Sequence, residues 1–217
     1  MTVISTANSS DLAAPVDQAT SLIAELVSEQ QSDIDMMIGI GLVKDSDAVF
    51  FQYVGDKEFQ ALMLPTGKPL TRLQNVKLTG ITIAEDIGEF NSTKINLYLT
   101  TNQGRTVMLT SGLTTIWTQC VLTGLIGAFE SGNIEFALTL DSWKGTSKMK
   151  PCFAAVRSGQ LKQTSQTMYD ALLDARSDRD YKKTETICRD AVAVLAQAVG
   201  LEAPVPTEIQ VEQETEF

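Results

Sequence analysis

Hydrophobic and polar residues alternate most regularly near the middle of the chain. Residues 94–101 read KINLYLTT, with isoleucine or leucine at every second position and lysine, asparagine and tyrosine between them. A period of two is typical of a strand with one buried face. The turn signal Asn102-Gln103-Gly104 follows, and residues 105–110 alternate again. The pattern therefore predicts a β-hairpin.

Further patterns extend this hairpin into a larger unit. Strand-like stretches occupy residues 73–83, 134–140 and 152–156, and an apolar helical run covers residues 113–129. The order is strand, strand, strand, helix, strand, strand, which is the succession of a five-stranded OB barrel. We therefore expect a mainly β protein with flanking helices (α+β), in which an OB-like barrel carries a helix between strands 3 and 4.

The patterns on either side of this unit are shorter. Apolar positions at 3.6-residue spacing predict a helix over residues 17–30, and short strand-like stretches follow it. Residues 164–175 and 184–199 have helical patterns, and Gly200 is suited to a C-cap. The expected organisation is a loose N-terminus at 1–16, a helix and short strands packing on the barrel at 17–64, the barrel at 65–160, a helical extension at 161–200 and a disordered acidic tail at 201–217.

Composition is that of a globular protein in water. The 217 residues are 43% hydrophobic, and the mean hydropathy is +0.01. No run approaches ~18 apolar residues, and the first residues lack the basic and apolar regions of a secretory signal. Cys120, Cys152 and Cys188 are widely spaced, so we expect reduced thiols rather than a disulfide framework or a zinc site. The expected location is cytoplasmic, with no membrane association.

Histidine is absent, which lowers the expectation of catalysis because the commonest general base and metal ligand is missing. The acidic cluster Glu85, Asp86 and Glu89 could hold a divalent metal, but a solvated turn between the first two barrel strands explains it better. Cys120 has no activating neighbour in the sequence. We expect no enzyme activity, no metal and no cofactor.

Charge is unevenly distributed along a chain whose net charge is −10. Residues 1–63 have a net charge of −8, residues 64–165 of +4 and residues 166–217 of −6. A basic middle between acidic ends favours a core that binds a polyanion. Chance clustering on an ordinary solvated surface explains the same distribution about equally well.

One loop combines aromatic side chains with several cations. The segment DSWKGTSKMKPCF lies between the last two barrel strands, where a loop of OB folds helps to frame the ligand groove. Single-stranded nucleic acid needs this mixture, because its bases stack on aromatic rings and its phosphates attract cations. The alternative is that the tryptophan caps the end of the barrel and the lysines keep an exposed hairpin soluble. The candidate residues are Trp143, Lys144, Lys148, Lys150 and Phe153.

A second candidate set lies on the polar face of the second and third barrel strands. Lys94, Tyr98 and Arg105 could line the floor of the same groove. An ordinary solvated strand face accounts for these three residues slightly better. They are therefore secondary candidates for nucleic-acid binding.

The last residues form an acidic segment. Residues 201–217 read LEAPVPTEIQVEQETEF, which contains two prolines and few large apolar side chains. This composition predicts disorder. A segment of this kind suits the basic, hydrophobic pocket of a partner protein. The expected partner contacts are Glu212, Glu214, Glu216 and Phe217.

A basic barrel of this element order followed by an acidic tail that ends in phenylalanine resembles the single-stranded DNA-binding proteins of bacteria and their phages. The resemblance covers roughly residues 70–156 and 208–217, and the chain has TEF where the bacterial proteins typically have an aspartate run followed by Ile-Pro-Phe. It implies a barrel that wraps single-stranded DNA. It also implies a tail that recruits replication, recombination or repair proteins and competes with DNA for the groove.

These features together predict non-catalytic binding of single-stranded DNA, with affinity that falls steeply as salt rises. Self-association through the late helices is also expected. One alternative is an adaptor of phage or plasmid type that binds only proteins, which predicts no DNA binding. The other is an enzyme that uses the acidic cluster with a metal, which predicts stabilisation by that metal.

Overall fold

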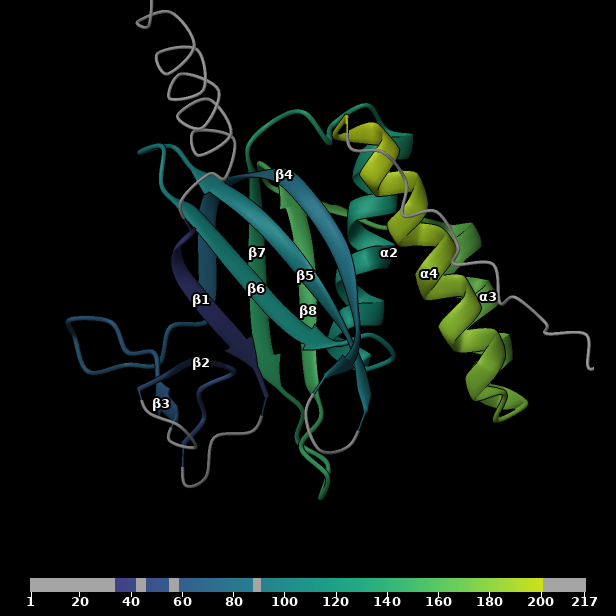
Figure 1. Cartoon of the computed structure of the whole chain (residues 1–217), viewed down its shortest axis with the longest axis horizontal. Coiled ribbons are helices and arrows are strands. Elements are labelled where there is room, and N and C mark those ends of the chain that lie inside the picture. Colours follow the sequence, from purple (N-terminus) through teal and green to yellow (C-terminus); the bar gives the residue numbers. More distant parts are fainter. Residues whose placement is uncertain (1–33, 42–45, 55–58, 88–90, 201–217) are drawn as a thin grey trace, which may run out of the picture. The chain divides into compact units, whose positions relative to one another are not determined.

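One sheet and three helices make up the described part of the chain. The computed structural model describes residues 34–41, 46–54, 59–87 and 91–200 (Figure 1). The strands are β1 (Ile34–Ile40), β2 (Phe50–Tyr53), β3 (Phe59–Ala61), β4 (Arg72–Ile87), β5 (Ser92–Thr101), β6 (Thr106–Gly112), β7 (Leu138–Lys144), β8 (Cys152–Ser158) and β9 (Leu161–Gln163). The helices are α2 (Ile116–Glu130), α3 (Gln166–Ser177) and α4 (Tyr181–Ala198). The helix predicted over 17–30 and the acidic tail lie outside the described residues.

The antiparallel meander β4-β5-β6 follows from the alternation along the chain. Along β5, the buried side chains are Ile95, Leu97 and Leu99, and the residues between them are half-buried. Leu97 pairs with Ile81 of β4 and with Leu109 of β6, so three apolar side chains meet at one level of the buried face. Burial of such cross-strand groups is the main stabilising contribution of this part of the sheet.

The sheet has nine strands in the order β3-β2-β1-β6-β5-β4-β7-β8-β9, and only β1 and β6 run parallel. β4 changes partner near Val76: its first residues pair with β7 and the rest pair with β5. As a result β5 and β6 cross in front of β7 and β8 in Figure 1, and the two halves of the sheet face each other across the core. The core residues Val76, Leu97, Leu99, Val121, Leu125, Leu138, Leu140 and Val156 surround one small cavity of about 20 Å³.

The predicted fold class is confirmed: the protein is mainly β with flanking helices. Its elements also follow one another in the predicted order, β4-β5-β6-α2-β7-β8. The expected closed five-stranded barrel is not seen, and the sheet is open. No ladder joins β6 to β8 in the ranges that the structure covers. The reason is that β1 pairs with the outer edge of β6, and β9 pairs with part of the outer edge of β8. Closure would need those two edges.

Helix α2 packs mainly against β8 and contributes to the core that both halves of the sheet share. Its N-cap is Thr115, whose side chain accepts a hydrogen bond from the backbone N–H of Thr118. Most α2 residues are buried, as the scarcity of charge in this segment predicts. Trp117 is 1% exposed, and its indole N–H donates to Ser142 Oγ at 3.0 Å, which ties the helix to β7.

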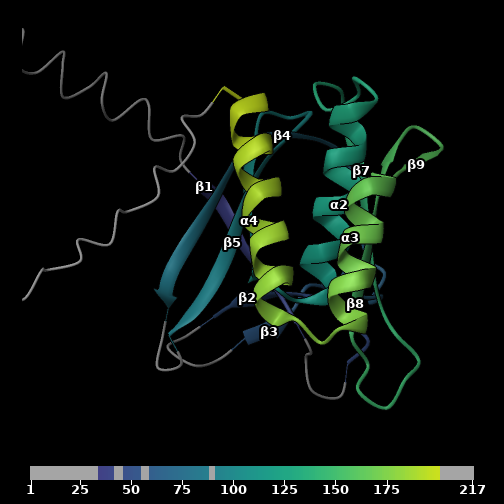
Figure 2. The same cartoon turned by 90° about the vertical axis from the view of Figure 1, so that its right-hand side faces the viewer.

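Helices α3 and α4 pack beside each other and against α2 (Figure 2). The side chains of Ser165 and Asp180 cap their N-termini. Leu172, Val192 and Leu195 are buried in the same core as the sheet, so the two helices are an integral part of the fold. None of the helices described here is long and apolar enough to cross a membrane.

Candidate nucleic-acid interface

Two stacked aromatic rings mark the end of the β7–β8 hairpin. Trp143 and Phe153 are cross-strand neighbours, with ring centroids 6.1 Å apart and ring planes 19° from parallel. Alternation along β7 buries Leu140 and Ser142 and turns Trp143 to the opposite side, where it is 44% exposed. A large part of the indole is therefore available to a planar ligand.

The loop that joins β7 and β8 places cations beside this ring pair. Lys148 and Lys150 are exposed in the loop. The backbone N–H of Lys150 donates to the carbonyl of Ser147 at 2.9 Å, which closes a turn. Lys144, at the end of β7, donates through Nζ to the carbonyl of Ser46. Lys144 thus helps to hold β7 against the segment before β2, whereas Lys148 and Lys150 are exposed charges.

A groove extends from the ring pair to α3. Its volume is about 260 Å³, and it lies between α2, β8, β9 and α3. Trp143 and Phe153 line one part of it, and Tyr169 lines another. Most of the lining is apolar, its cations are Lys162 and Arg176, and none of its lining residues is acidic. The groove therefore combines apolar surface with positive charge and has no carboxylate to repel an anion.

Arg176 is held in this groove by a neutral group. Its Nε and Nη2 donate to Gln119 Oε1 at 2.9 and 2.5 Å. Gln119 is itself fixed, because its Nε2 donates to the carbonyl of Thr114 at 2.7 Å. An amide positions the guanidinium without neutralising it. The charge of Arg176 is thus available to a phosphate or carboxylate, for which a planar guanidinium is well suited.

The acidic residue on the same side of β7 as Trp143 is already paired. Asp141 accepts hydrogen bonds from Arg72 and, at 2.9 Å, from Arg157 Nε. Burial of Asp141 opposes its ionisation, but the bonds from both arginines outweigh burial and hold the pKa of Asp141 below its ordinary value. Asp141 therefore remains ionised and neutralised, and the two arginines join β4, β7 and β8 to one another.

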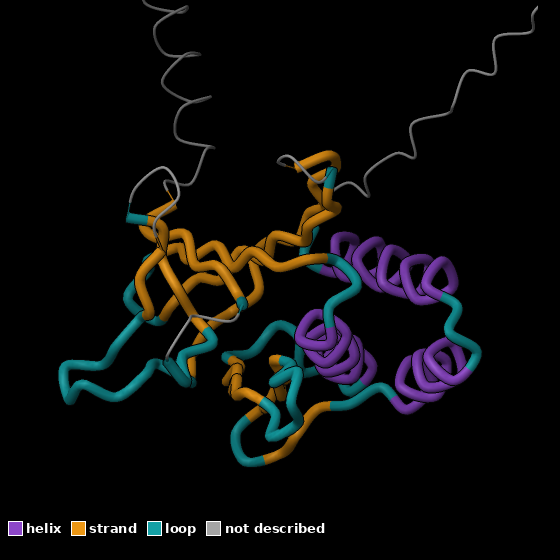
Figure 3. The backbone as a smooth tube through the Cα atoms, turned by 90° about the horizontal axis from the view of Figure 1, so that it is seen from below, coloured by secondary structure: helices purple, strands orange, loops and turns teal. Residues whose placement is uncertain are grey.

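The secondary candidates lie on a different surface. The strands β1, β6, β5 and β4 form a row, and Figure 3 shows that the described helices lie on one side of it. We call the other, outward side of these strands and of the β2–β3 hairpin the open face. Lys94 and Tyr98 belong to the open face, since they alternate with the buried residues of β5. Arg105 is exposed in the turn before β6. Gly80 lies against the Tyr98 ring, where an added Cβ would come within 3.1 Å of the ring.

The side chains of Trp143 and Tyr98 project from opposite sides of the fold. Leu140 of β7 and Leu97 of β5 line the same core cavity, while Trp143 and Tyr98 project from the other faces of the same two strands. The structure brings Trp143, Phe153, Lys144, Lys148 and Lys150 together and places Lys94 and Tyr98 on the open face. It does not join the two groups in one groove.

Sequence reasoning missed the groove residues that come from outside the hairpin. Lys162 lies on the short strand β9, and Tyr169 and Arg176 lie on α3. A signal for α3 exists in hindsight: Tyr169, Leu172, Leu173 and Arg176 are spaced at i, i+3, i+4 and i+7, so they share one face of the helix. Only the packing of α3 against α2 brings this face to the groove that Trp143 also lines.

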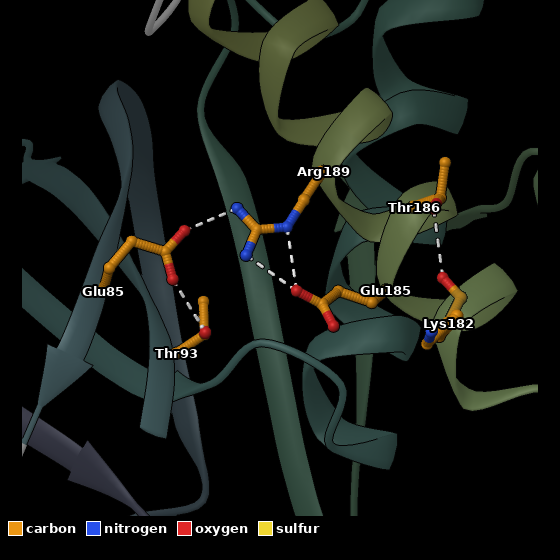
Figure 4. Close-up of polar contacts among 6 residues, drawn as sticks. All are labelled: Glu85, Thr93, Lys182, Glu185, Thr186 and Arg189. Carbon is orange, nitrogen blue, oxygen red and sulfur yellow. Dashed lines mark hydrogen bonds and ion pairs between the residues drawn. The ribbon is translucent and has the colours of Figure 1, made fainter. Parts of the chain in front are cut away.

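Glu85, the one residue of the acidic cluster whose side chain is described, makes structural contacts (Figure 4). Glu85 accepts a hydrogen bond from Thr93 Oγ1 at 2.8 Å and pairs with Arg189 of α4 at 2.6 Å. Arg189 also pairs with Glu185 at 2.7 Å. The bond from Arg189, helped by that from Thr93, holds the pKa of Glu85 below its ordinary value. Within the described ranges, which exclude Glu89, no cluster of histidine, cysteine or acidic residues could hold a metal.

The cysteines are free thiols in different places of the fold. Burial raises the pKa of Cys188 to about 12. Burial also raises the pKa of Cys152. Both groups are therefore protonated at neutral pH, and a protonated thiol is a poor nucleophile.

The predicted partner contacts Glu212, Glu214, Glu216 and Phe217 lie outside the described residues. Comparison with protein-family models, curated proteins and solved structures gives no match for this chain.

Proposed function

We propose that the protein binds single-stranded DNA, without catalysis, at the surface formed by the Trp143–Phe153 ring pair, the β7–β8 loop and the adjoining groove. We call this surface the tryptophan groove. The observation that carries the proposal is an exposed indole, stacked on a second ring, beside a groove whose only charged lining residues are Lys162 and Arg176.

The chemistry of single strands fits this arrangement. An unpaired base exposes its π-face, and stacking on an aromatic side chain is worth ~1–3 kcal/mol per base. Lys148 and Lys150 in the loop and Lys162 and Arg176 in the groove supply positive charge for the phosphates on either side of such a base. In a duplex the base faces are already stacked, so the ring pair favours the single strand.

The fold supports the same proposal. The sheet order β6-β5-β4-β7-β8, with α2 between the third and fourth of these strands in the chain, is that of an OB barrel opened between its third and fifth strands. We assign residues 65–160 as an OB-like unit on this basis. The β7–β8 loop then corresponds to a loop that borders the ligand groove in OB folds. A role in replication, recombination or repair, with the acidic tail recruiting partner proteins, is part of the proposal.

Binding to labelled oligonucleotides tests the proposal. The anisotropy of a labelled oligo-dT of ~30–40 nucleotides is titrated with protein at about 50 mM salt, beside a duplex of the same length. Binding to the single strand alone is expected. Trp143→Ala should weaken it by ~10- to 100-fold, because one stacking contact is lost.

Tyr181→Ala is the matched control, since Tyr181 is a highly exposed aromatic residue of α4 that does not line the groove. Its affinity should equal that of the wild type. No binding of oligo-dT by the wild type would remove the DNA proposal in favour of an adaptor that binds only proteins. Equal affinities of Trp143→Ala and wild type would move the DNA site away from the tryptophan groove.

A further inference from the structure

One carboxylate orients two arginines on the side of the sheet that faces away from the core. Asp141 of β7 accepts a hydrogen bond from Nε of Arg72 on β4 and another, at 2.9 Å, from Nε of Arg157 on β8. Neither Nη atom of Arg72 has a hydrogen-bond partner in the described part of the chain. Nη1 of Arg157 makes a long bond of 3.4 Å to the carbonyl of Gln160. The ends of both guanidinium groups are therefore available to a further acceptor, and we call Arg72 and Arg157 the arginine pair.

The arginine pair is exposed, whereas the carboxylate between its members is mostly buried. The side chains of Arg72 and Arg157 are 53% and 38% exposed, and that of Asp141 is 14% exposed. Lys162 of β9 is the cross-strand neighbour of Arg157 and is also exposed. Three cations and one carboxylate leave a net charge of +2 at this place, so the surface attracts an anion in spite of Asp141.

The arginine pair lies on the same side of β7 and β8 as the stacked rings of Trp143 and Phe153. Asp141 is two positions from Trp143 in β7, so both side chains point to one side of that strand. Arg157 is four positions from Phe153 in β8, and these two side chains share a side for the same reason. We call this side the hairpin face. From the β7–β8 loop towards β9 it presents, in order, Trp143 with Phe153, Asp141 with Arg72, and Arg157 with Lys162.

We infer that the arginine pair binds phosphates of the strand whose base stacks on Trp143, and that this strand runs from the rings along the hairpin face towards β9. The inference rests on the proposed DNA binding and adds two contact residues and a path to it. Same-side positions of a β-strand are ~7 Å apart. The phosphates of a stretched single strand are spaced at about twice the 3.4 Å rise of one strand of B-DNA. Because the two repeats match, a base on Trp143 places the next phosphate near Asp141 and the arginines beside it.

Asp141 fixes the orientation of the arginine pair. A planar guanidinium binds a phosphate best through two parallel N–H groups. Because Asp141 occupies the Nε of each guanidinium, the Nη edge is the one left for the ligand. Long side chains that are already held in place also lose less conformational entropy when the ligand binds. Asp141 is thus a positioning residue, and it supports binding although its own charge opposes that of a phosphate.

The salt dependence of oligo-dT binding tests the inference. Each phosphate contact of a single strand contributes ~0.7 to the slope of log K against log salt, and its loss weakens binding by ~3- to 10-fold at ~50 mM salt. Arg72→Gln and Arg157→Gln should each show both changes. Arg72 is the more exposed of the two, so Arg72→Gln decides the test if Arg157→Gln does not fold. Arg179→Gln is the matched control: it removes the same charge from an exposed arginine that follows α3, and it should keep the slope of the wild type.

Asp141→Asn separates positioning from charge. The substitution makes the hairpin face more positive, so general attraction alone would tighten binding, whereas loss of the fixed orientation should weaken it. Tighter binding by Asp141→Asn would therefore contradict the positioning role. If the wild type binds oligo-dT and Trp143→Ala weakens binding, but Arg72→Gln and Arg157→Gln keep the affinity and slope of the wild type, the inference is overturned and the proposed function stands. A wild type that does not bind oligo-dT would remove both.

Discussion

The tryptophan groove and the open face differ in what surrounds their aromatic rings. In the groove, Trp143 and Phe153 line the same cavity as Lys162 and Arg176, and no carboxylate lines it. On the open face, Phe51 and Phe59 belong to the acidic first part of the chain, whereas Tyr98 belongs to its basic middle and shares a face of β5 with Lys94. An exposed ring therefore does not by itself indicate its ligand. The charge beside the ring distinguishes a surface suited to a polyanion from one that is not.

Salt should have the largest effect, because it acts on the charge of the tryptophan groove. If the four cations Lys148, Lys150, Lys162 and Arg176 contact phosphates, raising salt from ~50 to ~200 mM weakens single-strand binding by ~50-fold. Oligo-dT binding is measured at both salt concentrations. A loss of only a few-fold would mean that these cations contribute little, and charge would then not distinguish the tryptophan groove from the open face.

Replacing Arg176 tests whether one positioned charge in the tryptophan groove contributes to DNA binding. Arg176→Ala should weaken single-strand binding by ~3- to 10-fold, because a positioned guanidinium is lost from the groove. Arg179→Ala serves as the control, because Arg179 is an exposed arginine that follows α3 and does not line the groove. Equal losses in both variants would indicate a diffuse effect of charge without a specific contact.

The ion pairs of Asp141 with Arg72 and Arg157 should contribute to the free energy of unfolding. Asp141→Asn should cost ~1 kcal/mol at neutral pH, because Arg72 and Arg157 lose their charged acceptor and both arginines are partly exposed. The folded pKa of Asp141 lies below its unfolded value of ~3.9. The stabilisation is therefore complete above that pH and disappears as pH falls through the folded pKa. Urea unfolding of both proteins between pH 7 and strong acid measures this difference. A difference that persists unchanged in acid would mean that the ionised carboxylate is not its cause.

The smallest expected effect concerns the acidic tail. Deleting residues 208–217 removes four carboxylates and should tighten single-strand binding by a few-fold, if these carboxylates compete with phosphates for the tryptophan groove. Oligo-dT titrations of the full and shortened chains at ~50 mM salt measure the effect. Equal or weaker binding by the shortened chain would remove the competition from the proposal.

Hydrophobic patterns in the sequence predict a helix or strand well where neighbouring residues determine it. The alternation of residues 94–101 predicted β5, because each buried residue is followed by one that is less buried. The charge-poor run near Trp117 predicted α2, although the helix begins at Ile116 rather than at residue 113. α4 begins at Tyr181, three residues before its predicted start, because the side chain of Asp180 caps the helix ahead of the residues that carry the helical pattern.

Contacts between distant segments could not be predicted in the same way. The parallel pairing of β1 with β6 joins residues about seventy positions apart, and no alternation specifies such a partner. This pairing occupies the edge that barrel closure would need. The same limit applies to the site: Trp143 and Phe153 were predicted together because one hairpin holds both. Arg176 was missed because only the packing of α3 brings it to the groove.

The two tryptophans of the chain give it an internal optical reporter. Trp117 is enclosed in the core with its indole N–H bonded to Ser142, so its emission should be blue-shifted and insensitive to dissolved quenchers. Trp143 is in contact with solvent, so its emission should be red-shifted and quenchable. A base stacked on Trp143 would extinguish the red component and leave the blue one as a reference. The unlabelled protein would then report occupancy of the tryptophan groove by the shape of its emission spectrum.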